Sequence, residues 1–484
     1  MWLFRQLFDT VLLLAEGIQK ALYEVPDFRT LEQQVVRCSQ EAARRLLGAA
    51  LEELDRALME RRDRSRLECV GMRRKSLLTW VGEISLQRRY YRDRQSGEGR
   101  FLLDEALGLQ PRQRYSPLVR EYGIELAVEM PFGGAEAWLA RVTQGAVQLS
   151  RMALWEDVQA AGAAAEAEAS RQRKAVFEDG QVPAGGRAAA ALDIEFDELF
   201  VPARRTKGAG RERIGLKQAV AYEGKGTDAR GRSYLKNRRV HVAVGEGPEV
   251  IEEALADFAH RWDWGMLQRC TVGGDGAPWI QKALEYLPQA RYQLDPFHLR
   301  RALREGLGHD PEAYRRLNAA LGEGKPWPDV EALLEEAIRR TRGRFRHRVR
   351  QLKQYLENQW AGIVADPEAR RLGAIEAQNY HVLARRMKRR GAAWSRRGAN
   401  HMARLLAARA NGELGRFAAR PWPRRQDLMA SVPRQGVLRQ RPCPQELEDA
   451  AAWLRVRMPA LYGPHSDRDW VKLLRQLTHG VGAA

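Results

Sequence analysis

The sequence predicts an α/β domain that follows a mainly helical N-terminal region and is interrupted by a helical insertion. Three observations support this fold class. From Met1 to about Leu67, apolar residues recur at every third or fourth position, as they do on helices. From residue 192 the period changes to two, which is typical of strands. After residue 298 the helical period returns, so that helical segments lie on both sides of a region of strands.

Length and composition indicate a folded chain of several domains. The 484 residues exceed what a single hydrophobic core usually holds, which favours two to four domains. The chain is 44% apolar and 30% charged, as in packed proteins, whereas disordered chains are poorer in aromatic and branched residues.

The charge balance predicts a polyanionic partner. Lys and Arg number 81 against 62 Asp and Glu, giving a formal net charge of +19. Such an excess creates a field that attracts nucleic acid. The alternative is that the basic composition only reflects a GC-rich genome.

Cysteine spacing and hydropathy predict a cytoplasmic protein without a membrane span. Cys38, Cys69, Cys270 and Cys443 lie far apart, so neither a zinc knuckle nor a disulfide framework is indicated. Charged residues interrupt the apolar N-terminus at helical spacing, which predicts an amphipathic helix rather than a targeting segment. No run reaches the 18 apolar residues that a membrane helix needs.

The N-terminal half contains two candidate DNA-binding elements. Aromatic and branched residues around a glycine predict two short strands between Ser76 and Arg92, with basic flanks. This hairpin could face DNA, or its cations could simply protect a sheet edge. From Ser116 to Ala164, helical stretches broken at Pro131 and Gly145 form a candidate helix-turn-helix, although any small helical bundle gives the same pattern.

Strand and helix signals alternate in the central region. Leu192, Ile194 and Phe196 alternate with acidic residues, which predicts a strand with one apolar and one carboxylate face. Further strands are expected at 217–222, 240–244, 270–274 and 291–294, with helices at 249–262 and around Ile280 and Leu284.

These signals divide the chain into six regions. We expect an N-terminal helical region with a basic hairpin at 1–110, a helical and candidate helix-turn-helix domain at 111–170, the first part of the α/β core at 190–298, a helical insertion at 299–370, the closing helix of the core at 371–410 and a C-terminal helical region at 411–484.

Three carboxylates are candidates for holding catalytic metal ions. Cutting or joining a phosphodiester needs charge neutralisation and an activated hydroxyl, and two Mg²⁺ ions about 4 Å apart supply both when Asp and Glu hold them. Asp197 ends the acidic face of the first strand; Asp193 is the alternative, because spacing alone does not say which acid binds metal. Asp275 follows a buried strand at a small-residue turn, where it could instead cap the next helix.

The third candidate is Glu376, on a predicted helix from Leu372 to Arg390. Asn379 lies on the same face, one turn later. Arg and Lys follow, so the helix could approach a metal first and a phosphate backbone next. The alternative is a charged, exposed helix without a functional role.

At these residues the sequence resembles bacterial insertion-sequence transposases of the ISLre type, which resemble the Mutator-like group of DDE transposases. Four ordered segments carry the resemblance, within about Ser76 to Arg404: Asp197 to Arg204, Gly274 to Ile280, Leu294 to Leu299, and Ala374-Ile375-Glu376 to Trp394-Ser395.

The resemblance implies a ribonuclease-H-like mixed sheet flanked by helices, split by a helical insertion between the second and third acids. It favours Asp197 over Asp193, and implies that Asp197, Asp275 and Glu376 are both the catalytic and the metal-binding residues, with two Mg²⁺ ions that Mn²⁺ could replace. Asp295 and His298 match a motif that supports the active site rather than binding the metals; Asn379 is expected to support it as well.

The expected partners are double-stranded DNA at element ends and at the target, and further copies of the chain, because two DNA ends must meet. The Arg-rich helices at 339–350 and 385–397 are the expected phosphate contacts. In the second helix the residues concerned are Arg385, Arg386, Lys388, Arg389, Arg390, Arg396 and Arg397.

The function expected from these features is that of a DNA transposase, which cleaves at element ends and transfers the strand to target DNA. The alternatives are a metal-dependent nuclease or resolvase of the same fold, which hydrolyses without joining, and a catalytically silent DNA-binding derivative. A basic RNA-associated protein would not need the carboxylates and ranks last.

Overall fold

The computed structural model describes residues 2–24, 27–205, 212–287, 289–363, 372–388 and 391–419. Within this part, the chain forms two compact units. Unit 1 contains the described residues up to 120 together with 136–149, and unit 2 contains 121–135 and the described residues from 150 to 419. Most of the expected C-terminal region, 411–484, lies outside the described residues.

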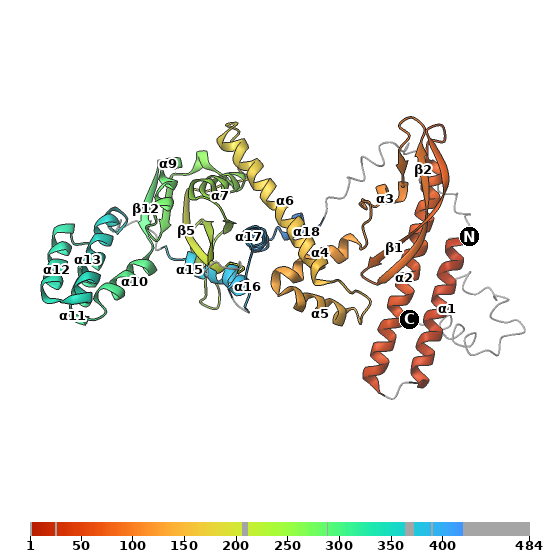
Figure 1. The fold of residues 1–484 in the computed structure, drawn as a ribbon, viewed down its shortest axis with the longest axis horizontal. Helices are drawn as coiled ribbons and strands as arrows, with labels where there is room; N and C mark the ends of the chain where they lie inside the picture. Colours follow the sequence, from red (N-terminus) through yellow and green to blue (C-terminus); the bar gives the residue numbers. More distant parts are fainter. Residues whose placement is uncertain are drawn as a thin grey trace, which may run out of the picture. The chain divides into compact units, whose positions relative to one another are not determined.

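Unit 1 combines two long helices with a long hairpin (Figure 1). Helices α1 (Trp2–Glu24) and α2 (Phe28–Arg61) pack together, and Asp27 caps the second. Strands β1 (Leu67–Thr79) and β2 (Gly82–Asp93) pair antiparallel, and β3 (Gly99–Arg100) and α3 (Leu102–Ala106) follow. The hairpin is therefore longer than the strands expected between residues 76 and 92.

Several of the hairpin's basic residues are paired within unit 1. Lys75 and Arg88 lie 3.6 and 3.3 Å from Asp104, and Arg89 lies 2.6 Å from the buried Asp55. These three basic side chains therefore stabilise the fold of unit 1 rather than contact DNA. The exposed basic residues of the hairpin are Arg73, Arg74 and Arg92.

The candidate helix-turn-helix corresponds to two short helices, α4 (Pro117–Glu129) and α5 (Phe132–Val142). The next helix, α6 (Arg151–Phe177), starts at a Ser150 cap and spans 27 residues. It packs against helices of unit 2, so it belongs with the sheet domain and not with the region before it.

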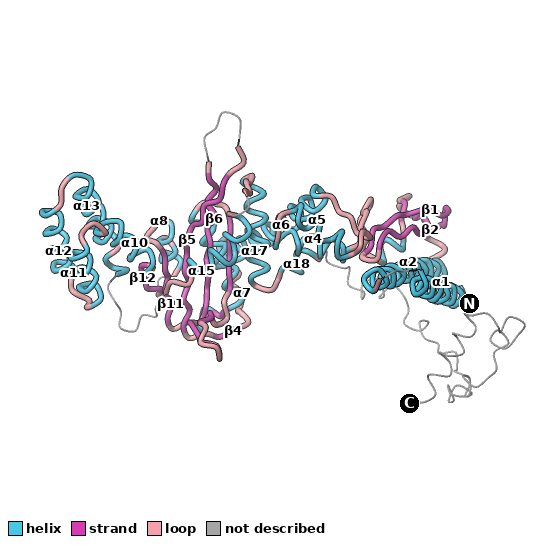
Figure 2. Tube along the Cα trace, turned by 90° about the horizontal axis from the view of Figure 1, so that it is seen from below, coloured by secondary structure: helices cyan, strands magenta, loops and turns pink. Residues whose placement is uncertain are grey.

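Unit 2 is built on a mixed five-stranded sheet with the order β12-β11-β5-β6-β9 (Figure 2). The first three strands along the chain, β5 (Ala191–Pro202), β6 (Arg213–Tyr222) and β9 (Arg239–Ala243), pair antiparallel. Strands β11 (Arg269–Gly274) and β12 (Ala290–Leu294) run parallel to β5 on its other side. The mixed α/β class predicted from the sequence is therefore confirmed.

Helices cover both faces of this sheet (Figure 1). Leu192, Ile194 and Phe196 of β5 pack in one core with α7 (Gly247–Arg261). The opposite face packs against α6 and against α17 (Arg396–Ala410). Asp193, Glu195 and Asp197 lie on this second face, because side chains alternate along a strand.

The helical insertion has a hydrophobic core of its own, built around Leu303, Leu334 and Leu352. Four of its helices supply this core, and a short fifth one follows. They are α10 (Pro296–Leu307), α11 (Pro311–Gly322), α12 (Trp327–Arg340), α13 (Gly343–Asn358) and α14 (Trp360–Ile363).

The chain returns to the sheet through one nearly continuous helix, formed by α15 (Ile375–Gln378), the π-helical η2 (Asn379–Ala384) and α16 (Arg385–Met387). The remaining elements are short: β4 (Arg187–Ala188), β7 (Lys225–Thr227), β8 (Ser233–Leu235), β10 (Trp262–Asp263), η1 (Trp264–Met266), α8 (Pro278–Gln281), α9 (Ala283–Tyr286) and α18 (Leu414–Ala418). Among the described residues, no helix is both long and apolar enough to cross a membrane.

Candidate active site

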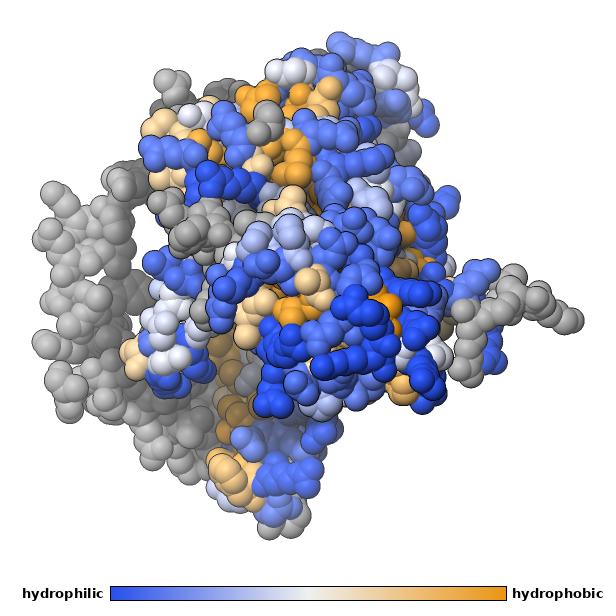
Figure 3. All heavy atoms as spheres, turned by 90° about the vertical axis from the view of Figure 1, so that its left-hand side faces the viewer, coloured by the Kyte–Doolittle hydropathy of each residue, from blue (hydrophilic) through white to orange (hydrophobic). Residues whose placement is uncertain are grey.

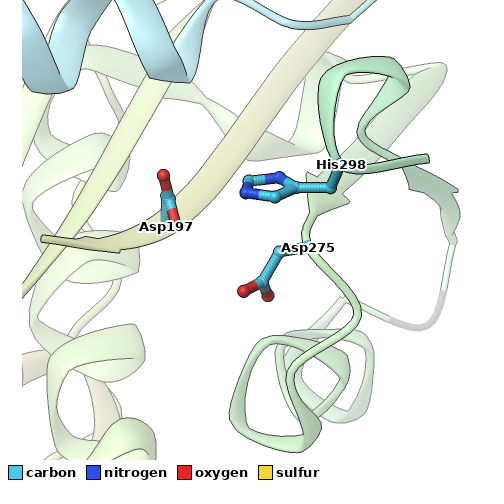
Figure 4. A group of neighbouring side chains, drawn as sticks. All are labelled: Asp197, Asp275 and His298. Carbon is cyan, nitrogen blue, oxygen red and sulfur yellow. The ribbon is translucent and has the colours of Figure 1, made fainter. Parts of the chain in front are cut away.

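The sheet brings together two acids and a histidine that are far apart in the sequence. Asp197 lies within β5, Asp275 directly follows β11, and His298 lies in the first turn of α10, just after β12. Each offers one ligand atom, and these atoms all lie within 4.8 Å of one another. Figure 4 shows the three side chains pointing toward a common space. The carboxyl ends of β11 and β12 meet at the same edge, which explains the convergence.

Asp197 is a buried carboxylate, with 6% of its surface exposed. Its Oδ1 accepts a hydrogen bond from the Glu198 backbone (2.7 Å), and its Oδ2 accepts one from the Asn379 side chain (2.5 Å). Burial raises the pKa of Asp197 to about 6; the charges of Asp275 and Glu376 add to this, while the Glu198 hydrogen bond and His298 oppose it. A bound cation would relieve this unfavourable charge.

Asp275 is held in a turn that the helical insertion braces. Its Oδ1 accepts a hydrogen bond from the backbone of Ala277 (2.9 Å), where α8 begins. The Tyr355 hydroxyl donates to the Asp275 carbonyl (3.1 Å), and the Gln359 side chain donates to the Gly276 carbonyl (3.2 Å). Asp275 therefore orders the turn before α8 and does not cap the helix, whose N-cap residue is Ala277. The same carboxylate still reaches Asp197 and His298.

His298 is oriented by a second carboxylate. Asp295 is 1% exposed, caps α10 through the Phe297 backbone (3.1 Å), and lies 3.0 Å from Nδ1 of His298. The hydrogen bond with Asp295 raises the pKa of His298, and burial opposes the shift. With Nδ1 engaged, Nε2 can hold a proton or bind a cation beside the carboxylates. The sequence resemblance implied only a supporting role for this residue.

Glu376 is the predicted acid that the structure places outside the group. It is exposed on α15, and its carboxylate is not among the ligand atoms within 4.8 Å. It nevertheless acts on the site, because its charge contributes to the raised pKa of Asp197. One turn later, Asn379 reaches Asp197 directly, and its buried Oδ1 has no hydrogen-bond partner among the described residues.

Sequence reasoning missed the role of Glu195. This residue is 1% exposed, and its carboxylate accepts hydrogen bonds from the backbone N–H groups of Gly373 (2.9 Å), Ala374 (3.0 Å) and Ile375 (3.2 Å). The Tyr222 hydroxyl also donates to it. Glu195 therefore fixes the start of the helix that carries Glu376 and Asn379, and its oxygens are already occupied.

We expect Glu195→Gln to loosen this helix. The new amide group would face backbone N–H donors and leave them without an acceptor, which costs about 1–3 kcal/mol. Urea unfolding should show that loss, and hydrogen exchange should quicken at Gly373, Ala374 and Ile375. Glu198→Gln is the matched control, because Glu198 is on the same strand but is partly exposed and pairs with Lys217. Equal behaviour of the two variants would contradict the anchoring role.

A cleft of about 620 Å³ extends from the site to the insertion. Asp275 and His298 lie at one end, and helices α10 and α13 supply the walls. Arg301 and Arg348 are exposed on these helices, and Arg301 pairs with Glu305, which also lines the cleft (2.8 Å). Burial raises the pKa of the lining Tyr355 to about 12, which keeps its hydroxyl protonated.

The donor groups fit a hard divalent cation in part. Asp197 and Asp275 supply carboxylate oxygens, and Asn379 donates to one of the Asp197 oxygens. His298 supplies a nitrogen, which suits Mn²⁺ better than Mg²⁺. The three residues could therefore hold a metal ion through two carboxylate oxygens and one imidazole nitrogen.

The predicted DNA contacts divide into exposed and buried residues. Arg386 is 8% exposed and donates two hydrogen bonds to the Ala127 carbonyl (3.0 and 3.1 Å), so it is a structural residue and its assignment to DNA was wrong. Arg389 and Arg390 lie outside the described residues. The exposed members are Arg385, Lys388, Arg396 and Arg397. Figure 3 shows that the face on the insertion side is mainly hydrophilic, with smaller apolar areas.

Comparison with known proteins gives one family. Residues 22–425 match the model of the uncharacterised protein family UPF0236. A UPF0236 protein of Caldanaerobacter subterraneus subsp. tengcongensis is 27% identical over 407 residues, which cover 83% of this chain and 82% of that protein. A second from that organism, whose name joins eleven designations, is 26% identical and covers 83% and 81%. A Streptococcus gallolyticus protein, in the vanSb 3′ region, is 26% identical and covers 82% and 86%.

These matches correct the resemblance drawn from the sequence. The four motifs suggested ISLre-type, Mutator-like transposases, whereas the family model and the relatives all carry the UPF0236 description. Short acidic motifs recur in unrelated metal sites, so they did not suffice to identify the family.

Proposed function

The chain belongs to the uncharacterised protein family UPF0236, and we propose from its own site that it is a DDE-type DNA transposase. In this proposal it cleaves phosphodiester bonds at element ends and transfers the freed strand into target DNA. The observation that carries it is the pair Asp197 and Asp275, held by two neighbouring strands with His298 within 4.8 Å.

The fold proposed for this activity is a ribonuclease-H-like core. The supporting features are a central strand that carries one acid, a parallel neighbour that ends at the second, and a late helix that carries Glu376. The helical insertion separates the second acid from that helix, and has a core of its own.

Divalent cations bound at such carboxylates neutralise charge on the reacting phosphate and lower the pKa of the attacking hydroxyl. Asp197 and Asp275 would hold them, with Asn379 Oδ1 as a further oxygen. Glu376, exposed beside the site, would join when DNA is bound. His298 would hold or release a proton at Nε2, and Arg301 and Arg348 would orient the phosphate backbone in the cleft.

Two further observations agree with DNA as the substrate. The net charge is +19, and exposed Arg396 and Arg397 begin α17. One relative carries a name that joins eleven designations. Repeated copies of one element in a genome would produce such a name. Two element ends must meet during transposition, so at least two copies of the chain are expected on DNA.

The proposal is tested with DNA copied from the sequences that flank the gene. With Mg²⁺ or Mn²⁺, and not with EDTA, the protein should nick at the element boundary and leave a 3′ hydroxyl. Cleavage without regard to sequence would favour a nuclease of the same fold. DNA binding without any cleavage would favour a silent derivative and reject the catalytic proposal.

A further inference from the structure

Unit 2 has a second cavity, of about 550 Å³, that the catalytic proposal does not use. Aromatic rings and cations form much of its lining. Trp155 and Met152 of α6 are 44% and 62% exposed. Its lining includes Phe132, Arg151, Met152, Trp155, Arg204 and Trp394.

The aromatic walls of this cavity are held in place. Trp394 is 9% exposed, and its indole N–H donates to the Met387 carbonyl (3.1 Å). The Arg386 guanidinium lies 5.4 Å from the Trp394 ring centre and 5.8 Å from that of Phe132. The buried Arg386 side chain thus holds the rings of Phe132 and Trp394 in place. The Trp155 side chain is instead exposed to solvent.

The charge of the lining selects an anion. Arg151 and Arg204 are the exposed cations of the lining, and no Asp or Glu is among its described lining residues. A planar group that stacks on aromatic rings and carries a nearby negative charge matches this combination. A nucleotide has both properties, because its base stacks and its phosphate pairs with arginine.

We propose that this cavity receives one unstacked base of the bound DNA, with Trp155 stacking on the base and Arg204 contacting its phosphate. A base inside a duplex cannot enter a concave site, so it must leave the helix first. The inference rests on the proposed function, and it adds a substrate contact away from the catalytic carboxylates.

The position of Arg204 gives an approximate distance between the cavity and the catalytic carboxylates. Arg204 follows Asp197 by seven residues along β5 and its extension, or about 23 Å at roughly 3.3 Å per residue. That length corresponds to about seven base-pair steps of B-DNA, at about 3.4 Å each. The extruded base would therefore lie several nucleotides from the cut, where it would fix the register of the DNA end.

The test uses binding in EDTA, so that cleavage plays no part. Two duplexes of one sequence carry 2-aminopurine at the same position, either paired or opposite an abasic site. The native protein should bind the unpaired form at least about tenfold more tightly, with a change in 2-aminopurine fluorescence. Trp155→Ala should remove most of that preference, Trp155→Phe should retain it, and Arg204→Ala should weaken binding of the unpaired form.

Two matched controls test the assignment to this cavity. Trp138 is 42% exposed and Arg205 is exposed, but neither lines the cavity. Trp138→Ala and Arg205→Ala should leave the preference intact.

The inference alone is overturned if native protein binds both duplexes equally, or if Trp155→Ala and Trp138→Ala behave alike. A change in the sedimentation of DNA-free Trp155→Ala would overturn it by assigning the cavity to a second copy of the chain. Failure to bind either duplex would overturn the proposed function as well.

Discussion

Replacing Asp275 by Asn is expected to lower metal-dependent DNA cleavage by at least about 10³-fold, which corresponds to about 4 kcal/mol. The physical reason is that the amide removes one of two converging carboxylates while keeping its size. The fold should survive, because an Asn oxygen can still accept the hydrogen bond from Ala277. Single-turnover cleavage of end-containing DNA measures the loss, and DNA affinity should stay unchanged.

Asp263→Asn is the matched control for this variant. Like Asp275, the Asp263 side chain accepts a hydrogen bond from a backbone N–H two residues later, that of Gly265. Asp263 lies outside the group formed by Asp197, Asp275 and His298. It should cleave like the native protein. Cleavage by Asp275→Asn at the native rate would show that Asp275 is not a catalytic residue.

The second large effect concerns stability without metal. Burial raises the pKa of Asp197 from 3.8 to about 6, so the folded state favours the protonated acid. That stabilisation is fully present below pH 3.8 and is lost as the pH rises through about 6. Ionised Asp197 then costs roughly 3 kcal/mol. We expect metal-free Asp197→Asn to be more stable than the native protein by up to that amount at pH 8, with a smaller difference at pH 5.

Metal addition should remove most of this difference. Mn²⁺ at about 100 times its dissociation constant would stabilise the native protein by about 2.7 kcal/mol, but would not stabilise Asp197→Asn. Thermal unfolding with and without Mn²⁺ measures both effects. Asp193→Asn is the control, because Asp193 is buried on the same face of β5 but is not in the acidic group. Loss of the metal response in Asp193→Asn, and not in Asp197→Asn, would identify Asp193 as the ligand.

The sheet and two of the site residues could be predicted because their signals are local. The alternation of Leu192, Ile194 and Phe196 with acids marked β5 correctly, since a strand with two different faces has period two. A small-residue turn after a buried strand marked Asp275. Strands at β6, β9, β11 and β12 were recognised within a few residues for the same reason.

The remaining features depend on contacts between distant segments. Spacing alone did not separate Glu195 from the other acids of its strand, because its role depends on the backbone of Gly373 to Ile375, which is distant in the sequence. His298 enters the group because β12 ends beside β11, which no spacing rule reports. Arg386 looked like its exposed neighbour Arg385, yet its side chain is buried against Ala127.

Strand transfer with pre-cut ends tests the proposed transposase activity. A labelled oligonucleotide that ends in the element's 3′ hydroxyl is incubated with the native protein, Mg²⁺ and a supercoiled plasmid. We expect labelled plasmid products that disappear with EDTA or with Asp275→Asn. Nicked plasmid without joined label, or bound oligonucleotide without any product, would contradict transposition.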